Sequence, residues 1–373
     1  MGRAWIAMNG CIHQSGAVNR NRMGRRKALR HLSALAASAV CLPSLQAAPP
    51  KKCGMGLVVY VCRFRAKWLR SQAGERDLNQ PIEFLRHCHQ LGAGGAQITL
   101  YGLSDDERKQ LRTFTTDQNL FVEGIISPPT DRRDVERFRR QVKSSAEAGA
   151  KVLRTVVMPG RRYERFKTLE EFKEYEARAR RMLELAAPVM EKERVQLAVE
   201  NHKDQRSDER VALFEYIGSE YVGACLDTGN SFALLEDPLE TVKMLAPWTK
   251  TVHLKDQGLQ SSPNGFLLGD IPLGQGAFDL PSLVNAVREQ KPDVRFCLEL
   301  ITRDPLQVNC LNDQYWSTMP SVPGSELART LRTVRQHEAR LARVNDLTLE
   351  QQVEVEDANV RESIEYARDV LKI

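Results

Sequence analysis

Residues of the kinds that bind divalent cations stand near the ends of four successive apolar runs. They are Glu200 in VQLAVEN, Asp227 in VGACLDT, His253 in TVHLKD and Glu299 in VRFCLEL. A lone buried carboxylate is costly, and three carboxylates brought together repel one another unless a cation or a proton compensates them. Oxygen and imidazole ligands without sulfur favour one divalent metal ion, with Mn²⁺ first and Mg²⁺, Co²⁺ or Zn²⁺ as alternatives.

Two further residues share the strand parity of these candidates. His202 points with Glu200 and Lys255 points with His253, because alternate side chains of a strand lie on one face. His202 is expected to bind substrate or to hydrogen-bond a neighbouring strand end. Lys255 is expected to stabilise a developing enolate oxygen or to pair with Asp227. Taken singly, each residue is more simply a hydrogen-bonded or solvent-facing group, and only the set of four favours a metal site.

Whether the four candidates meet depends on the elements that carry them. Strand-like runs alternate with amphipathic segments along the chain. The strand-like runs cover residues 56–62, 96–100, 120–127, 151–157, 195–201, 222–228, 251–256 and 294–300. Eight β-α units in a chain of 373 residues predict an α/β fold, a (β/α)₈ TIM barrel in a single domain. In that fold the carboxyl ends of the strands carry the chemistry, so the four candidates are expected to meet there.

The predicted helices leave one segment beyond the barrel. They lie near residues 80–91, 105–118, 131–147, 168–192, 208–217, 238–246, 279–290 and 324–342. A charged segment at 347–371 predicts an extra C-terminal helix packed outside the barrel. The chain is therefore divided into a barrel at 54–342 and a C-terminal helical extension at 343–373. Long connections at 257–278 and 301–323 follow the last two strands, and loops of that length usually carry function.

Aromatic and basic residues after the strands are candidates for a sugar pocket, because aromatic faces pack well on sugar C–H surfaces. Beside His202 and Lys255, the candidates for substrate binding are Trp68, Tyr101, Arg161, Arg162, Phe266, Arg303 and Trp316. Packing within a loop, or a solvated surface, is the competing interpretation for each. The glycines at 274–276 lack the Lys-Ser/Thr of a P-loop and predict a flexible lid segment.

The first 48 residues look like a targeting sequence. They hold seven of the 54 Lys and Arg and no acidic residue, and Arg25 and Arg26 precede a short apolar run at 32–45. The run is too short and too broken by serine for a membrane span, so export followed by cleavage is expected. The arginine pair resembles a twin-arginine signal, which predicts a periplasmic protein. A disordered basic tail is the alternative.

The composition of the remaining chain excludes several classes of partner. Beyond residue 48 the chain has 47 basic and 48 acidic residues, so no excess of positive charge suggests a nucleic-acid or anionic-membrane partner. The expected partner is a small-molecule carbohydrate, and the sequence leaves open whether the protein is a homo-oligomer. Six cysteines lie beyond residue 48 without a CxxC pair, so they are expected to be buried thiols.

The ligand-bearing motifs also carry a family resemblance. AVENH, CLDTGN, HLKD and CLEL, with PLGQGAFDL after the seventh strand, resemble the sugar phosphate isomerase/epimerase superfamily with its xylose isomerase-like barrel. The resemblance covers about residues 54–342 and implies one divalent metal held by Glu, Asp, His or Gln, and Glu. These ligands map onto Glu200, Asp227, His253 and Glu299. The ketose 3-epimerases have a histidine shortly after the aspartate, where this chain departs from the family with GNS.

The same superfamily includes endonuclease IV, whose three-zinc site needs several histidines. The chain beyond residue 48 has five, namely His87, His89, His202, His253 and His337, and only two of them lie near the ends of strands. A DNA-repair enzyme is therefore excluded by ligand count.

The predicted function is proton transfer at a carbon next to a sugar carbonyl, as in a metal-dependent isomerase or epimerase that works through an enediolate. Glu200 and Glu299 are the expected acid and base, while Asp227 and His253 are ligands only. One alternative is a 3-keto-glycoside lyase that uses the same enolisation. Another is a non-catalytic exported sugar-binding protein, against which the two carboxylates speak, because a binder does not need both.

Overall fold

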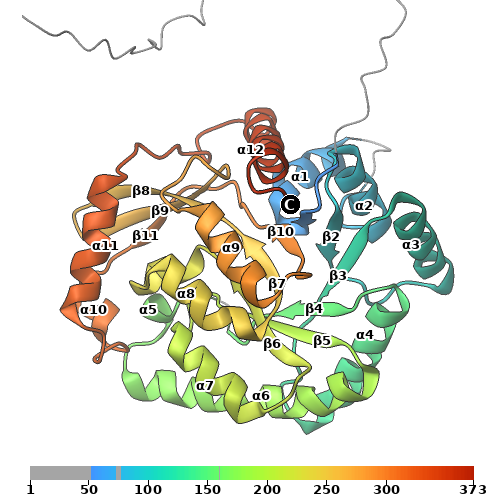
Figure 1. The fold of residues 1–373 in the computed structure, drawn as a ribbon, viewed down its shortest axis with the longest axis horizontal. Coiled ribbons are helices and arrows are strands. Elements are labelled where there is room, and N and C mark those ends of the chain that lie inside the picture. Colours follow the sequence, from blue (N-terminus) through green and yellow to red (C-terminus); the bar gives the residue numbers. More distant parts are fainter. Residues whose placement is uncertain (1–51, 73–76, 159) are drawn as a thin grey trace, which may run out of the picture. The chain divides into compact units, whose positions relative to one another are not determined.

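Eight parallel strands close into a barrel in the order β1-β10-β7-β6-β5-β4-β3-β2 (Figure 1). The computed structural model describes residues 52–72, 77–158 and 160–373, so the predicted signal at 1–48 lies outside the described residues. The barrel strands are β1 (Gly56–Val58), β2 (Gly95–Ile98), β3 (Phe121–Ile125), β4 (Val152–Thr155), β5 (Gln196–Glu200), β6 (Val222–Asp227), β7 (Thr249–Leu254) and β10 (Phe296–Leu298). This is the predicted (β/α)₈ TIM barrel.

Helices alternate with these strands. They are α1 (Arg63–Ser71), α2 (Pro81–Gln90), α3 (Asp105–Gln118), α4 (Val135–Glu147), α5 (Arg162–Arg165), α6 (Leu169–Glu193), α7 (Ser207–Ile217), α8 (Pro238–Leu245), α9 (Leu280–Gln290), α10 (Asp313–Trp316), α11 (Gly324–Gln336) and α12 (Leu349–Asp369). Among the described residues, no helix is long and apolar enough to cross a membrane. The first predicted strand, 56–62, is too long, because the chain turns into a 3-10 helix at Val59–Cys62 and then into α1.

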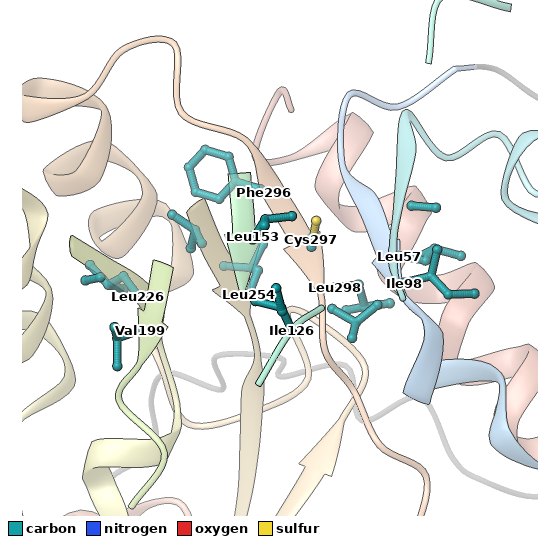
Figure 2. Packing of buried hydrophobic residues seen from close by; sticks show 14 of the residues in the cluster. Leu57, Ile98, Ile126, Leu153, Val199, Leu226, Leu254, Phe296, Cys297 and Leu298 are labelled. Atoms are coloured by element: carbon teal, nitrogen blue, oxygen red, sulfur yellow. The ribbon is translucent and has the colours of Figure 1, made fainter. Parts of the chain in front are cut away.

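An apolar layer surrounds a polar barrel interior. Leu57, Val199, Leu226 and Leu254 belong to one buried cluster that also takes in residues of the helices (Figure 2). The interior holds buried polar side chains instead, among them Gln97, Glu123, Arg154, Glu200, Thr251 and His253. Such groups are tolerated in a core only when they bond one another or serve a function. The six cysteines of the described residues are free and buried, as predicted.

The C-terminal helix α12 packs among the outer helices of the barrel. Val360, Ile364 and Ala367 belong to the main apolar cluster, and α12 lies beside α1 (Figure 1). Arg288 of α9 donates to the carbonyl of Leu371, directly after α12. The predicted helix at 324–342 ends earlier, at Gln336, and packs against an added sheet. The predicted end of the helix at 324–342 was therefore wrong, while the predicted extra C-terminal helix is present.

The added sheet fills the two long connections. It has three antiparallel strands in the order β11-β9-β8, namely β8 (Asp256–Ser262), β9 (Gly265–Ile271) and β11 (Leu306–Val308). The flexible lid predicted at 274–276 is also wrong. The backbone N–H groups of Gly274 and Gly276 each donate to Asp256 Oδ2 at 2.9 Å, and Gly274 lies against the ring of Tyr366.

Candidate metal centre

The four predicted metal ligands lie together at the carboxyl ends of their strands. Glu200 ends β5, Asp227 ends β6, His253 lies on β7 and Glu299 directly follows β10. One ligand atom from each lies within 4.8 Å of the others, and all four residues are buried. Asp227 is paired with His253 in the register of β6 and β7, which fixes the centre of the group.

Three buried ligand atoms of this group face one another: Asp227 Oδ2, His253 Nδ1 and Glu299 Oε2. His253 Nδ1 lies 3.2 Å from Glu299 Oε2 and 3.5 Å from Glu200 Oε2. Three carboxylates buried so close together repel one another unless positive charge compensates them. Three carboxylates and one imidazole match the oxygen and nitrogen ligands of a divalent cation, and the residues present therefore fit one.

The imidazole of His253 is oriented from below by a polar chain in the barrel interior. Its Nε2 lies 2.8 Å from Gln97 Oε1, and Gln97 Nε2 donates to Glu123 Oε2 at 3.1 Å. Thr251 donates to the same carboxylate at 2.8 Å. This chain keeps the proton on Nε2 and turns Nδ1 toward the carboxylates, as outer partners of metal-bound histidines do.

The neighbouring carboxylates favour a charged imidazole at His253. Burial acts to lower the pKa of His253, but the carboxylates of Glu299 and Glu200 outweigh it and raise that pKa.

Glu200 is held by an arginine and an amide. Arg154 Nε donates to Glu200 Oε2 at 2.7 Å, Nη2 of Arg154 bonds the same oxygen, and Asn230 Nδ2 donates to Oε1 at 3.0 Å. Burial acts to raise the pKa of Glu200, but the guanidinium outweighs it and lowers that pKa to about 2. Glu200 is therefore an ionised carboxylate at neutral pH.

Asp227 is fixed through one oxygen. Asp227 Oδ1 accepts the backbone N–H groups of Gly229 at 2.9 Å and Asn230 at 2.7 Å, while Asn201 Oδ1 accepts the N–H of Asp227 at 2.7 Å. Burial raises the pKa of Asp227 to about 6, against the opposing effect of Lys255. The other oxygen, Oδ2, remains directed at the group of ligands.

Lys255 lies among the ligands, as its strand parity predicted. Its Nζ is 3.1 Å from Asp227 Oδ2 and 2.7 Å from Glu299 Oε2. Burial acts to lower the pKa of Lys255, but these two carboxylates outweigh it and raise that pKa. The same contact, with His253, holds the pKa of Glu299 well below its usual range despite burial. The predicted pairing of Lys255 with Asp227 is present.

Three of the predicted substrate-binding residues lie near this centre. His202 Nδ1 is buried without a partner, and burial lowers the pKa of His202 although Glu200 opposes it. Arg303 Nη2 donates to Asp270 Oδ2 at 3.3 Å, and both groups act electrostatically on a lysine of the site, Lys203. Tyr101 is half-buried and interacts electrostatically with Tyr60.

The structure gives the other pocket candidates structural partners. Trp68 packs with Phe64 and Val344 between α1 and the C-terminal segment, which favours the competing interpretation of structural packing. Arg161 pairs with Glu164, Arg162 pairs with Glu209 and stacks on Phe172, Phe266 is buried against Phe232, and Trp316 donates to the carbonyl of Cys310.

Sequence reasoning missed several residues of the centre: Gln97, Arg154, Lys203, Asn230 and Tyr60. Gln97 and Arg154 had a signal, because each is a polar residue inside a strand-like run. Asn230 stands in the GNS that departs from the ketose 3-epimerase pattern. Tyr60 was placed in a strand, whereas it belongs to a 3-10 helix. Burial raises the pKa of its hydroxyl, and the charges of Arg154, Glu299 and Glu200 also act on that pKa.

The barrel, with buried acidic and imidazole side chains at the carboxyl ends of its strands that could hold a metal ion, is an α/β TIM barrel. Residues 85–319 match the xylose isomerase-like TIM barrel family, and the chain belongs to that family.

Solved structures agree with this fold. L-ribulose 3-epimerase superposes with a TM-score of 0.52 at 15% identity, over 84% of this chain and 95% of that one. D-psicose 3-epimerase from Clostridium cellulolyticum H10, solved with D-tagatose, gives 0.53 at 13% identity, over 80% and 94%. A xylose isomerase-like TIM barrel protein from Mycobacterium smegmatis, in complex with magnesium, gives 0.50 at 16% identity, over 77% and 98%. At these identities the likeness shows the fold alone.

One curated relative matches part of the sequence. The 3-oxo-isoapionate decarboxylase of Pectobacterium atrosepticum is 28% identical over 120 residues. The match covers 32% of this chain and 44% of the relative, so it spans less than half of that protein.

Proposed function

We propose that the protein is a metal-dependent isomerase or epimerase of carbohydrates that abstracts a proton from a carbon next to a carbonyl. The observation that carries this proposal is the group of four buried ligand residues whose ligand atoms lie within 4.8 Å of one another. Membership of the xylose isomerase-like family supports it.

Glu200, Asp227, His253 and Glu299 would hold one divalent cation, with Mn²⁺ first among Mn²⁺, Mg²⁺, Co²⁺ and Zn²⁺. The bound cation supplies Lewis-acid stabilisation of an oxygen that becomes negative when the neighbouring carbon is deprotonated. A structural neighbour holds magnesium, which supports a divalent cation without choosing among the four.

The side chains supply the proton transfer. Glu200 and Glu299 come from the outer two of the four ligand strands and are both ionised, so either can accept the proton from carbon. The carboxyl group formed in this way can then return its proton to the neighbouring carbon, while the other carboxylate can do so only after it has taken up a proton from solvent. Arg154 and Asn230 hold the carboxylate of Glu200 in one orientation. Lys255 places an ammonium beside Glu299, where it can stabilise a developing oxyanion.

The substrate is proposed to be a small carbohydrate that contacts His202, Tyr101 and Arg303. His202 has the clearest free atom, because its buried Nδ1 lacks a partner. The arginine pair at residues 25–26 supports export to the periplasm, which is proposed on the sequence of residues 1–48.

A second candidate reaction is decarboxylation of a 3-oxo sugar acid, which the partial match to 3-oxo-isoapionate decarboxylase favours. In that reaction the bond from carbon to the carboxylate breaks, carbon dioxide leaves, and the electron pair forms an enolate that then takes up a proton. The same cation and the same side chains would serve both reactions, because both pass through an enolate.

The test uses the full chain. Bound metals are quantified, and the protein is incubated in D₂O with ketoses, 3-keto-glycosides and 3-oxo sugar acids while NMR follows deuterium and carbon dioxide. Deuterium uptake that needs metal and is lost in Glu200→Gln and Glu299→Gln is expected. Glu356→Gln is the matched control, because Glu356 is also buried but caps the start of α1.

The outcomes separate the candidates. Release of carbon dioxide from a 3-oxo sugar acid, without exchange in ketoses, favours the decarboxylase. Elimination from a 3-keto-glycoside points to a lyase instead. Stoichiometric metal with no reaction in any arm leaves a sugar-binding protein, and absence of bound metal overturns the site.

A further inference from the structure

Lys203 is a buried cation next to the candidate metal centre. It follows β5 by three residues, is 5% exposed, and donates from Nζ to Asn230 Oδ1. The same amide bonds Glu200 through its nitrogen and lies 3.4 Å from Lys255 Nζ through its oxygen. One amide therefore ties the ammonium of Lys203 to the ligand group.

Lys203 differs from every other buried basic residue of the described chain. Each of the others pairs with a carboxylate: Arg154 with Glu200, Arg162 with Glu209, Arg210 with Asp204, and Lys255 with Asp227 and Glu299. Among the described residues no carboxylate lies within 4.0 Å of Lys203 Nζ, and an amide oxygen is the partner that its Nζ has. A buried ammonium without an anion is costly.

The charges around Lys203 are mixed. Besides burial, two cations, Lys255 and Arg303, lower its pKa, and two carboxylates, Asp227 and Asp270, raise it. Burial and then Lys255 lower the pKa of Lys203 to about 8. A divalent cation bound to Asp227 would add further positive charge, so the loaded site has room for an anion.

The backbone at Lys203 is also unusual. Its φ is +63°, in the left-handed region that residues other than glycine rarely adopt, and its carbonyl accepts the N–H of Arg162 at 3.0 Å. Such strain persists only where the surroundings enforce it, and it is common at binding sites. Here the left-handed backbone conformation places the buried ammonium of Lys203 at the edge of the ligand group.

We propose that Lys203 binds a carboxylate of the substrate, so that the carbohydrate is a keto sugar acid rather than a neutral ketose. This inference rests on the proposed function and names its substrate class. One uncompensated ammonium matches the single charge of a carboxylate, whereas a phosphate monoester brings more charge than the site lacks.

The experiment measures the affinity of the full chain, loaded with Mn²⁺, for sugars that differ in one group. D-fructose is compared by calorimetry with 2-keto-D-gluconate, which carries a carboxylate at C1, with D-fructuronate, which carries one at C6, and with D-fructose 6-phosphate. At least one keto acid is expected to bind about 10- to 100-fold more tightly than fructose, as charge-assisted hydrogen bonds allow.

Variants assign that preference to Lys203. Lys203→Met is expected to reduce the preference to less than about threefold, and Lys203→Arg to keep most of it, because the arginine retains the charge. Lys250→Met is the control, since Lys250 lies on β7 and donates to the backbone carbonyl of Glu220. Metal content and melting temperature are recorded for each variant.

Several results would overturn the proposal. Equal affinity of the unsubstituted protein for fructose and both keto acids would do so even if Lys203→Met failed to fold. So would tightest binding of the phosphate ester, or a preference that persists in Lys203→Met and therefore comes from the cation. Deuterium exchange is measured separately. Exchange into neutral ketoses without tighter binding of a keto acid would contradict this inference alone. Tighter binding of a keto acid without any exchange would contradict only the proposed reaction.

Discussion

Replacing Arg154 by methionine tests whether the carboxylates of the centre are arranged for a cation. Arg154 and Glu200 are both buried, and Arg154 is the cation that bonds the Glu200 carboxylate directly. After burial, Arg154 has the largest effect on the pKa of Glu200, which is lowered to about 2. Breaking one buried ion pair costs about 3 to 5 kcal/mol, and the lower value is taken for this pair.

In the absence of metal, Arg154→Met should therefore lower the melting temperature by about 4 to 5 °C for a chain of this size. Excess Mn²⁺ should restore most of this loss, because a cation at the ligand group gives Glu200 a new partner. A ligand at 100 times its Kd stabilises a protein by about 2.7 kcal/mol, so the rescue is within reach. The assay is thermal unfolding with EDTA and with Mn²⁺.

Arg210→Met is the matched control. Arg210 pairs with Asp204 at 2.7 Å, both side chains are fully buried, and neither is a candidate ligand. This variant should lose comparable stability without a larger gain from Mn²⁺ than the unsubstituted protein shows. The reasoning fails if Mn²⁺ rescues both variants equally, or if Arg154→Met melts at the unsubstituted temperature in EDTA.

Three further predictions concern the outer partners of the centre, the C-terminal helix and the 274–276 segment. Gln97→Leu removes the acceptor of His253 Nε2, and calorimetry should show metal affinity about 10- to 100-fold weaker; unchanged affinity would refute the orienting role. Burial raises the pKa of Glu356 to about 7, so its contribution to stability is full below about pH 4.5 and is lost as pH rises through 7. Glu356→Gln should flatten the fall of melting temperature between pH 5 and 8, and an unchanged slope would contradict this. Gly274→Ala should cost more than about 2 kcal/mol in urea unfolding, because a Cβ there meets a tyrosine ring of α12. Gly102→Ala is the control, because Gly102 has the same φ of +83° and a Cβ there would have no atom within 4 Å. An equal loss of unfolding free energy in the two variants would show that backbone strain, and not the contact with the tyrosine ring, causes the loss.

The four metal-ligand candidates could be predicted from the sequence, because a parallel barrel brings the carboxyl ends of successive strands to the same end of the barrel. Each strand of such a barrel runs the same way, so residues near the carboxyl ends of successive runs meet without knowledge of the helices. The register bears this out, since Asp227 and His253 are paired across β6 and β7. Strand parity likewise placed Lys255 beside Asp227.

The remaining features depend on packing that local patterns do not encode. The amphipathic pattern of α12 shows a buried face but does not say that α1 will cover it. Trp68 looked like a pocket aromatic because it follows the first strand, yet the chain enters α1 there and turns the ring toward Val344. The sheet of β8, β9 and β11 pairs segments far apart in sequence, which no short pattern reveals.

Lys255 contacts the carboxylate oxygens that a metal ion would bind, and this affects both the metal-free protein and the binding of an anionic substrate. Its ammonium pairs with Asp227 Oδ2 and Glu299 Oε2, the same oxygens that a cation would take. Lysine and metal therefore compete for these oxygens, which explains how so many buried carboxylates are tolerated when no metal is present. A cation that takes the oxygens weakens the hold on Lys255, and it leaves two ammonium groups, those of Lys255 and Lys203, around the amide oxygen of Asn230. Loading with metal should thus strengthen the attraction of this edge for an anionic group, so that metal and keto acid bind with positive cooperativity.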